Sequence, residues 1–297
     1  MKSSIQPSTL KIIIGTANFG SEYGTGKLSK KFPKPDIEKF FGDMVSNTDV
    51  LIDTANSYGK SELLIGRYAP LALDNRVITK ISIKENDTYD SVVSSIKRSL
   101  DNVQQNSFLG VLIHNANFLN ASNANEIVRG LLHCQDVGLT KNIGVSCYEV
   151  NEIIKIKNRY NFLTNYQLPE NVADRRNSKN ADLLNLKMQG YNVVIRSVFL
   201  QGTLVSNLKL LPNFLKSSKH IFQNIEDYCK EKNFSKLKYC LDYARTLEWN
   251  SGIVLGIQNF EQYKEILGEL QNPIAIRNFP TEVLDSITVD PRNWTDE

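Results

Sequence analysis

The chain has 297 residues, of which 41% are apolar and 23% charged, and its formal net charge is +3. This composition is typical of a globular protein and excludes a disordered one. The small net charge gives no electrostatic reason to expect nucleic acid or an anionic membrane as a partner. The four cysteines form no C-x-x-C pair, so the sequence predicts free thiols in a reducing compartment, without a zinc site or a redox pair.

Neither a signal peptide nor a membrane span is predicted. The opening residues, MKSSIQPSTL, lack the hydrophobic core of a secretory signal. No stretch approaches the roughly 20 apolar residues that a membrane-spanning helix needs. We therefore expect a soluble, cytoplasmic protein without a membrane partner.

Short β-branched runs alternate with longer amphipathic segments along the whole chain. We expect strands over residues 11–15, 50–53, 76–80, 108–114, 141–146, 162–167, 192–197 and 252–256. Each run is short and nearly continuous in apolar residues, as strands buried on both faces are. The segments between them have helical periodicity, and the last interval contains two helical patterns, near 219–231 and 235–248.

Eight strands, each followed by a helix, predict an α/β fold: one (β/α)8 TIM barrel, a single domain over residues 1–297. A doubly wound open sheet is the alternative, but it usually has fewer strands and carries G-x-G-x-x-G after the first. Here the first strand is followed by GTANFG (15–20), which lacks that spacing. The irregular, polar tail after about residue 275 is expected to pack over one end of the barrel.

Polar side chains end six successive predicted strands. They are Asp53, Lys80, His114, Ser146, Gln167 and the pair Arg196–Ser197. In a barrel of this kind the C-terminal strand ends and the loops after them carry the chemistry. A single polar ending can be a charge that reaches solvent, but six in succession predict a site above the strands.

The first of these residues can form a proton donor for a carbonyl oxygen. Asp53 and Lys80 end adjacent strands and can pair, and Tyr58 lies five residues beyond Asp53. The field of Lys80 is expected to lower the pKa of Tyr58, which then acts as a general acid. His114 can hydrogen-bond the same oxygen. These residues include no nucleophile–base pair and no metal cluster, so a hydride-carrying cofactor is implied.

The chain resembles the aldo/keto reductase superfamily over essentially its full length. The matching motifs are GTANFG (15–20), LIDTANSYGKSELLIG (51–66), VITK (77–80), LIHNA (112–116), KNIGVS (141–146), NYQLPENVADRR (165–176), RSVFLQGTL (196–204) and GIVLGIQNFEQYKEIL (252–267). The resemblance implies reversible hydride transfer between NAD(P)H and a carbonyl, with Asp53, Tyr58, Lys80 and His114 as the catalytic tetrad. The first and seventh motifs look most like bacterial members encoded with surface-polysaccharide or nucleotide-sugar genes.

The resemblance also implies how a cofactor and a substrate bind. Ser146 and Gln167 would hydrogen-bond the nicotinamide carboxamide, segment 196–204 would cover the pyrophosphate, and the loop after the last strand would hold the adenosine end. The residues expected to bind the cofactor are Thr16, Ser146, Gln167, Arg196, Ser197, Phe199, Gln201, Gly202, Gly256, Gln258 and Gln262. Those expected near the substrate are Phe19, Tyr23, Asn115 and Arg176.

Three positions depart from the family's usual pattern. Cys147 follows Ser146 where the family usually has asparagine. Arg196 stands where many members stack an aromatic ring on the nicotinamide, and its planar guanidinium can stack similarly. Residues 256–262 lack the cation that members preferring NADPH use for the 2′-phosphate. On family grounds NADPH is expected, with NADH as the alternative.

The partner is expected to be a small carbonyl compound, such as an aldehyde, a ketone, a sugar or a nucleotide sugar. Arg175–Arg176 could meet an anionic substrate or could simply begin a solvated helix. Two other functions fit the same site. One is a nucleotide-binding sensor or regulatory protein with negligible turnover, although such a protein would not need all four tetrad groups. The other is a sugar dehydrogenase that runs toward oxidation.

Overall fold

The predicted strands are present in the computed structural model, which describes residues 10–274, 279 and 282–294. The strands are β1 (Lys11–Gly15), β2 (Val50–Asp53), β3 (Val77–Ile81), β4 (Phe108–Ile113), β5 (Thr140–Ser146), β6 (Asn165–Pro169), β7 (Asn192–Arg196) and β8 (Gly252–Gly256). They are short and rich in isoleucine, valine and leucine, because both faces of each strand are covered.

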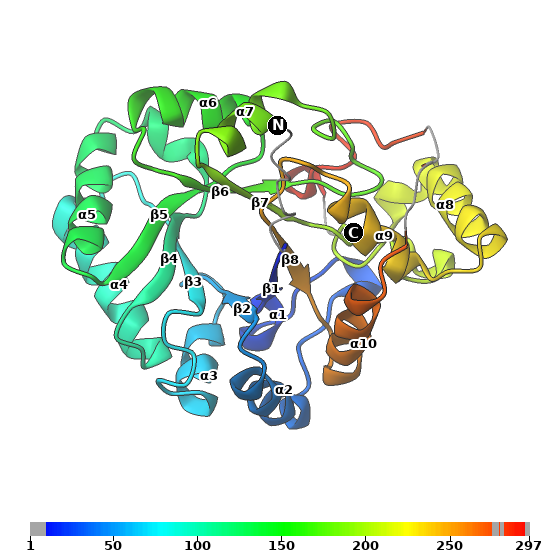
Figure 1. Cartoon of the computed structure of the whole chain (residues 1–297), viewed down its shortest axis with the longest axis horizontal. Helices are drawn as coiled ribbons and strands as arrows, with labels where there is room; N and C mark the ends of the chain where they lie inside the picture. Colours follow the sequence, from blue (N-terminus) through cyan, green and yellow to red (C-terminus); the bar gives the residue numbers. More distant parts are fainter. Residues whose placement is uncertain (1–9, 275–278, 280–281, 295–297) are drawn as a thin grey trace, which may run out of the picture.

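The strands form one closed, parallel barrel in chain order. The ring closes where β1 pairs with β8, with Ile13 opposite Val254. Figure 1 looks down on this ring. The predicted (β/α)8 barrel is therefore confirmed, and its parallel order brings the C-terminal ends of all eight strands to the same end.

Helices form an outer layer around the ring (Figure 1). They are α1 (Ala17–Gly20), α2 (Lys34–Ser46), α3 (Ser61–Tyr68), α4 (Tyr89–Val103), α5 (Ala124–Asp136), α6 (Val150–Arg159), α7 (Ala181–Met188), α8 (Lys219–Glu231), α9 (Lys236–Arg245) and α10 (Phe260–Gln271). In α4, Val92, Ile96 and Leu100 form the buried face. No helix in the described ranges is long and apolar enough to cross a membrane.

The sixth strand begins later than the sequence predicts. We expected it over 162–167, whereas β6 spans Asn165–Pro169. Residues 161–164 instead form the turn that ends α6, in which the amide of Leu163 donates to the carbonyl of Tyr160 at 3.0 Å. An apolar run shows that a segment is buried, but it does not show where pairing with the neighbouring strand starts.

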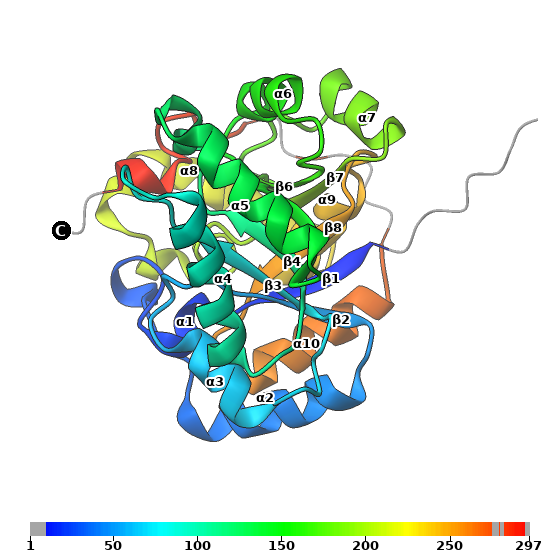
Figure 2. The same ribbon diagram turned by 90° about the vertical axis from the view of Figure 1, so that its left-hand side faces the viewer.

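The C-terminal segment 282–294 has no helix or strand longer than the single turn Pro291–Asn293. Leu284 and Val289 are buried, and the amide of Leu284 donates to the carbonyl of Ala173 at 2.8 Å. In Figure 2 this segment, in red, lies at the same end of the barrel as the blue loop after β1. The tail therefore packs as predicted, while residues 275–278, 280–281 and 295–297 lie outside the described residues.

Candidate active site

A buried ion pair joins the ends of β2 and β3. Lys80 Nζ contacts Asp53 Oδ2, and both side chains are at most 4% exposed. Gln167 Nε2, from β6, donates to the other carboxylate oxygen of Asp53 at 2.6 Å. A buried carboxylate is tolerated only when such partners replace its lost hydration. The pairing of Asp53 with Lys80 is therefore present as expected, and Gln167 supports it from across the barrel.

Tyr58 and His114 lie against this pair. Lys80 Nζ is 5.2 Å from the centroid of the Tyr58 ring. The rings of Tyr58 and His114 meet edge to face, with their centroids 5.7 Å apart. The structure thus brings together all four residues that the sequence singled out, although two lie in strands β2 and β3 and two in the segments that follow β2 and β4.

The predicted lowering of the Tyr58 pKa is wrong. Burial raises the pKa of this phenol well above its usual value, and the negative charge of Asp53 raises it further. The positive charge of Arg196 lowers the pKa of Tyr58 by less than burial and Asp53 raise it. Tyr58 is consequently protonated at neutral pH, which is the state that a proton donor requires.

His114 is uncharged at neutral pH. Burial lowers its pKa to about 4, and the charge of Lys80 adds to the effect. Its Nδ1 lies 3.2 Å from the hydroxyl of Ser57 and 3.5 Å from that of Ser82. When a serine donates to Nδ1, the proton of the neutral ring is on Nε2. His114 can then donate a hydrogen bond without carrying a charge.

Two glycines that the sequence analysis did not identify hold the Tyr58 loop in place. A Cβ on Gly20 would lie 2.1 Å from the carbonyl oxygen of Tyr58, so only glycine allows the two backbones to approach. Gly59 has φ +56°, and a Cβ there would lie 3.2 Å from the oxygen of Gly20. Both glycines belong to motifs quoted above, GTANFG and SYGK. These motifs therefore position the phenol as well as supplying it.

A cavity of about 530 Å³ runs from the tetrad along the ends of β5 to β8. It is lined by Tyr58, Lys80, His114 and Asp53, and by every residue predicted to bind the cofactor except Thr16. Thr16 is fully buried, and its hydroxyl donates to the carbonyl of Asp53 at 3.1 Å. Its prediction as a ligand contact is wrong, because the hydroxyl is used to fix the strand end that carries Asp53.

The predicted substrate residues separate into three groups. Tyr23 is half-exposed and lines the main cavity, and Asn115 lines a smaller one beside it. Phe19 is not at the mouth: it is fully buried, stacked on Phe32 with their centroids 4.3 Å apart. Its ring is apolar and packs among other aromatic rings, which excludes it from substrate contact.

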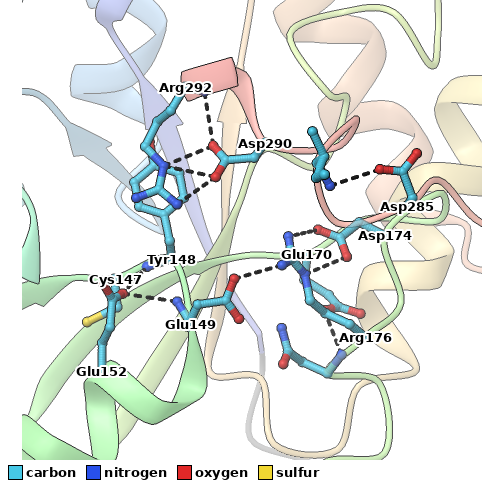
Figure 3. Close-up of polar contacts among 12 residues, drawn as sticks. Cys147, Tyr148, Glu149, Glu152, Glu170, Asp174, Arg176, Asp285, Asp290 and Arg292 are labelled. Atoms are coloured by element: carbon cyan, nitrogen blue, oxygen red, sulfur yellow. Dashed lines mark hydrogen bonds and ion pairs between the residues drawn. The ribbon is translucent and has the colours of Figure 1, made fainter. Parts of the chain in front are cut away.

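Arg176 lines neither cavity. Its guanidinium is held by Asp174 at 2.9 Å and by Glu149 at 2.7 Å, as the dashed lines in Figure 3 show. The sequence marked this arginine as a candidate for an anionic substrate, but the structure uses it to join the loops after β5 and β6. Two residues absent from the sequence prediction, Tyr148 and Arg292, line both cavities instead.

The chemistry of the cavity fits a nicotinamide. Gln167 Oε1 is buried without a hydrogen-bond partner among the described residues, and Gln167 is paired in register with Ser146. The carboxamide of nicotinamide has both a donor and an acceptor for such a pair. At Gly256, a Cβ would meet no atom within 4 Å, so the strand end is open to the cavity.

Backbone strain is concentrated in the segment expected to cover the pyrophosphate. The backbone φ angles of Ser197, Leu200 and Gln201 are +60°, +46° and +51°, values that residues other than glycine rarely adopt. Strain of this kind costs on the order of 1–3 kcal/mol per residue and is commonly found at ligand-binding segments. Ser197 and Gln201 line the cavity, whereas Leu200 does not. Two strained residues of this segment therefore face the cavity.

The comparison with known families identifies the chain. The model of the aldo/keto reductase family matches residues 11–282. The chain belongs to the aldo/keto reductase family. A search of curated proteins found no match. Family membership implies an oxidoreductase that acts on small carbonyl compounds.

Solved structures of aldo-keto reductases share the fold. AKR11C1 from Bacillus halodurans (holo form) aligns with a TM-score of 0.70 and 15% identity over 91% of each chain. Thermostable Tm1743, solved with the inhibitor epalrestat, aligns with a TM-score of 0.65 and 17% identity over 89% of this chain and 91% of its own. PA4992, a putative aldo-keto reductase from Pseudomonas aeruginosa, aligns with a TM-score of 0.62 and 15% identity over 87% of this chain and 88% of its own.

The reductase has no cluster of three or more metal-binding side chains within the ranges that the structure describes. Its four cysteines, Cys134, Cys147, Cys229 and Cys240, are all free and buried. The pKa of Cys147 is raised by burial, so this thiol is protonated.

Proposed function

We propose that the protein is an NAD(P)H-dependent carbonyl reductase in which Tyr58 is the proton donor. The observation that carries this proposal is the arrangement at one end of the main cavity, where a protonated Tyr58, a neutral His114 and the Lys80–Asp53 pair face one space. A protein that only binds a nucleotide and catalyses no reaction has no need of a buried ion pair beside a phenol. The sensor alternative is therefore not favoured.

The reaction adds two hydrogens to the carbonyl in different forms. Ser146, Gln167 and segment 196–204 would hold a nicotinamide cofactor, which would provide the hydride for the carbonyl carbon. Tyr58 gives its phenolic proton to the carbonyl oxygen, and the product is an alcohol. His114 donates a hydrogen bond from Nε2 to the same oxygen and so orients it. The phenolate regains its proton from water.

Lys80 acts after the proton leaves. With its Nζ 5.2 Å from the Tyr58 ring centroid, the ammonium stabilises the phenolate that proton transfer creates. Asp53 keeps Lys80 charged within the buried site, since burial alone lowers the pKa of Lys80 and Asp53 opposes that shift. Asp53 and Lys80 thus serve the proton donor together. The same groups serve the oxidation direction, in which Tyr58 accepts the proton.

The nucleotide preference depends on the far end of the cavity. There the described lining residues from segments 197–206 and 254–262 are all uncharged. Lys264, the nearest cation along the chain, contacts Asp43 at 2.8 Å. NADPH is expected from the family resemblance, but a 2′-phosphate normally recruits cations. We propose that NADH binds at least as tightly as NADPH.

The remaining predictions from the sequence are kept as part of this proposal. They are a single domain over residues 1–297, a cytoplasmic location, and a sugar or nucleotide sugar as the substrate, without nucleic acid or membrane as partners. We also propose an association with surface-polysaccharide or nucleotide-sugar genes.

The test is a fluorescence titration of the purified protein with NADPH and then NADH, followed by consumption of the tighter-binding cofactor with D-glyceraldehyde. Micromolar binding with turnover is expected. Binding without turnover on any of a panel of aldehydes, ketones and sugars would favour the sensor. Failure to bind either nucleotide would overturn the proposal, because the cavity along β5 to β8 would then hold another ligand.

A further inference from the structure

A second cavity of about 300 Å³ adjoins the active site at His114. His114, Tyr148 and Arg292 line both cavities, so the two meet beside the proposed proton donor. A substrate whose carbonyl lies between Tyr58 and His114 therefore extends into this second space. Its lining determines which substrates fit.

Most side chains that line the second cavity carry a polar group. The wall includes the hydroxyls of Ser57 and Ser82 and the side chains of Asn115, Asn117 and Glu152, and Ala116 is its one apolar member among the described residues. Ordinary ligand pockets are mostly apolar with a few polar groups. The hydroxyl and amide groups on this wall can pair with a ligand that has several hydroxyls, each of which both donates and accepts.

Two arginines stack on one tyrosine at the junction of the cavities. The guanidinium carbon of Arg292 lies 3.7 Å from the centroid of the Tyr148 ring, and that of Arg196 lies 4.4 Å from it. Both guanidinium groups are therefore within cation–π distance of the same ring. Their stacking on the ring fixes both planes while leaving edge N–H groups for a ligand.

The charge of Arg196 is not neutralised. Its terminal nitrogens donate to the hydroxyl of Ser197 and to the carbonyl of Cys147, both at 3.3 Å, and both acceptors are uncharged. Its Nε is buried without a partner among the residues described. No carboxylate pairs with Arg196 within the described ranges. The main cavity therefore carries an uncompensated positive charge near the tetrad.

Arg292 is held in position by Asp290. Its Nε donates to both carboxylate oxygens, at 3.0 and 2.9 Å (Figure 3). Its Nη2 donates to the same group at 2.5 Å, while Nη1 has no hydrogen bond to any described residue. The single helical turn that contains Arg292 is itself anchored, because Leu284 and Val289 before it are buried. The C-terminal segment thus presents one fixed, unused guanidinium nitrogen at the junction.

We propose that the physiological substrate is a polyhydroxylated carbonyl compound that carries an anionic group, as a sugar phosphate, a sugar acid or a nucleotide sugar does. This rests on the proposed function of the same site. The hydroxyls occupy the second cavity, and the phosphate or carboxylate lies at the junction against Arg292 and Arg196. Arg292 is the residue that selects for the anion.

The test is a substrate series that first adds hydroxyls and then introduces a phosphate or a carboxylate. Propanal, D-glyceraldehyde, glyceraldehyde 3-phosphate and tartronate semialdehyde differ by hydroxyls, then by a phosphate or a carboxylate. We expect kcat/KM to rise with the hydroxyls and to rise at least about tenfold more with one of the anions, the effect typical of a charge-assisted hydrogen bond. The better anion identifies the phosphate or the carboxylate source. Equal values for glyceraldehyde and both anions would overturn the proposal.

Variants assign this preference to Arg292. Arg292→Gln should reduce the preference for the anionic substrate about tenfold, mainly through KM, and Arg292→Lys should restore part of it. Arg129→Gln is the matched control, because Arg129 is an exposed arginine on α5 that pairs with Glu126. Circular dichroism checks folding. An equal loss on glyceraldehyde and on its phosphate would assign Arg292 a structural role and overturn its part in selection.

A binding measurement separates failure of this inference from failure of the proposed function. Glycerol phosphate and glycerol lack a carbonyl, and their binding to the wild type and to Arg292→Gln can be compared by saturation-transfer NMR. Glycerol phosphate binding that is lost in Arg292→Gln, without turnover of any aldehyde, would support the inference and count against the reductase. Turnover of neutral aldehydes with no binding preference for the phosphate would do the reverse.

Discussion

The two sides of the barrel mouth handle charge in opposite ways. On the side of β2 to β4, the positive charge of Lys80 is fully paired with Asp53 and both side chains are sealed from water. On the side of β5 to β7, Arg196 contacts only uncharged acceptors, and Arg292 keeps one guanidinium nitrogen unused by any described residue. The cavity runs between these two sides.

The difference follows from what each side is proposed to meet. A cation that serves a proton donor is needed in every turnover, so its carboxylate partner belongs to the protein. A cation without a resident carboxylate can be neutralised by a ligand, and Arg196 is such a cation among the described residues. The protein holds Asp53 against Lys80, while near the other side Asp174 and Glu149 pair with Arg176 and Asp290 pairs with Arg292, which keeps only Nη1 for a ligand.

The largest effect is expected from Tyr58→Phe, which removes the proton donor from the paired side. Turnover should fall by about 10²–10⁴-fold, the range attributed to general acid catalysis, while cofactor affinity is kept. Steady-state rates and a fluorescence titration measure the two quantities. Tyr68→Phe, on α3 away from the cavity, is the matched control. Near wild-type turnover in Tyr58→Phe would show that the proton comes from another group.

Lys80→Met tests whether the pair is sealed as the structure indicates. The variant leaves Asp53 buried without its cation, so the free energy of unfolding should fall by about 3–5 kcal/mol in urea denaturation. The double variant with Asp53→Asn should recover part of that loss, because no buried charge remains. A cost as small as that of Lys39→Met, which removes an exposed ion pair on α2, would contradict the sealed pair.

Glu170, which follows β6 on the side of β5 to β7, links the free energy of unfolding to pH. Burial raises its pKa to about 8, while Tyr243 donates to it at 2.6 Å. The folded state therefore holds a proton that the unfolded chain releases near pH 4.5, so the free energy of unfolding should fall as pH rises from about 4.5 to about 8. The slope is at most about 1.4 kcal/mol per pH unit.

Glu170→Gln should flatten this part of the stability profile, because the amide resembles the protonated carboxyl and does not titrate. Denaturation midpoints at several pH values between 5 and 8 measure the slope. Glu261→Gln, in the first turn of α10, is the control and should leave the slope unchanged. An unchanged slope in Glu170→Gln would place the titrating group elsewhere.

The smallest effect is expected at the uncharged end of the cavity, where β8 closes the ring between the two sides. Gln262→Arg adds a cation beside the position expected for a 2′-phosphate, and should tighten NADPH relative to NADH by several-fold. The gain is limited because Gln262 Oε1 accepts the amide of Gln258 at 2.7 Å, a contact that arginine cannot make. An unchanged ratio of the two dissociation constants would place the adenosine end elsewhere.

The sequence predicted the barrel and the grouping of the tetrad because both follow from local patterns. Short apolar runs separated by helical segments leave few alternatives to a parallel ring, and a ring brings Asp53, Lys80 and His114 to one end. It did not predict the start of β6, since an apolar run is compatible with more than one register. It placed Phe19 and Thr16 at the mouth because a motif fixes the position of a loop but not the direction of each side chain.

The electrostatic state of the site was beyond the sequence for a different reason. A lysine near a tyrosine favours ionisation of the phenol, but the sign of the net effect depends on burial and on how closely Asp53 approaches that lysine. Arg176 and Arg292 show the same limit. Both lie in polar segments. Arg176 is bound by Asp174 and Glu149, whereas Arg292, near the C-terminal end of the chain, lines the cavity.

The sequence by itself thus determined the fold, the residues at the strand ends and the family, because these depend on periodicity and on motifs that are local in the chain. The tertiary structure alone decided the protonation of Tyr58 and His114, the pairing of Arg196, Tyr148 and Arg292, and the polar second cavity. Those properties depend on distances and burial among residues as far apart in the chain as Tyr148 and Arg292, which no local pattern encodes.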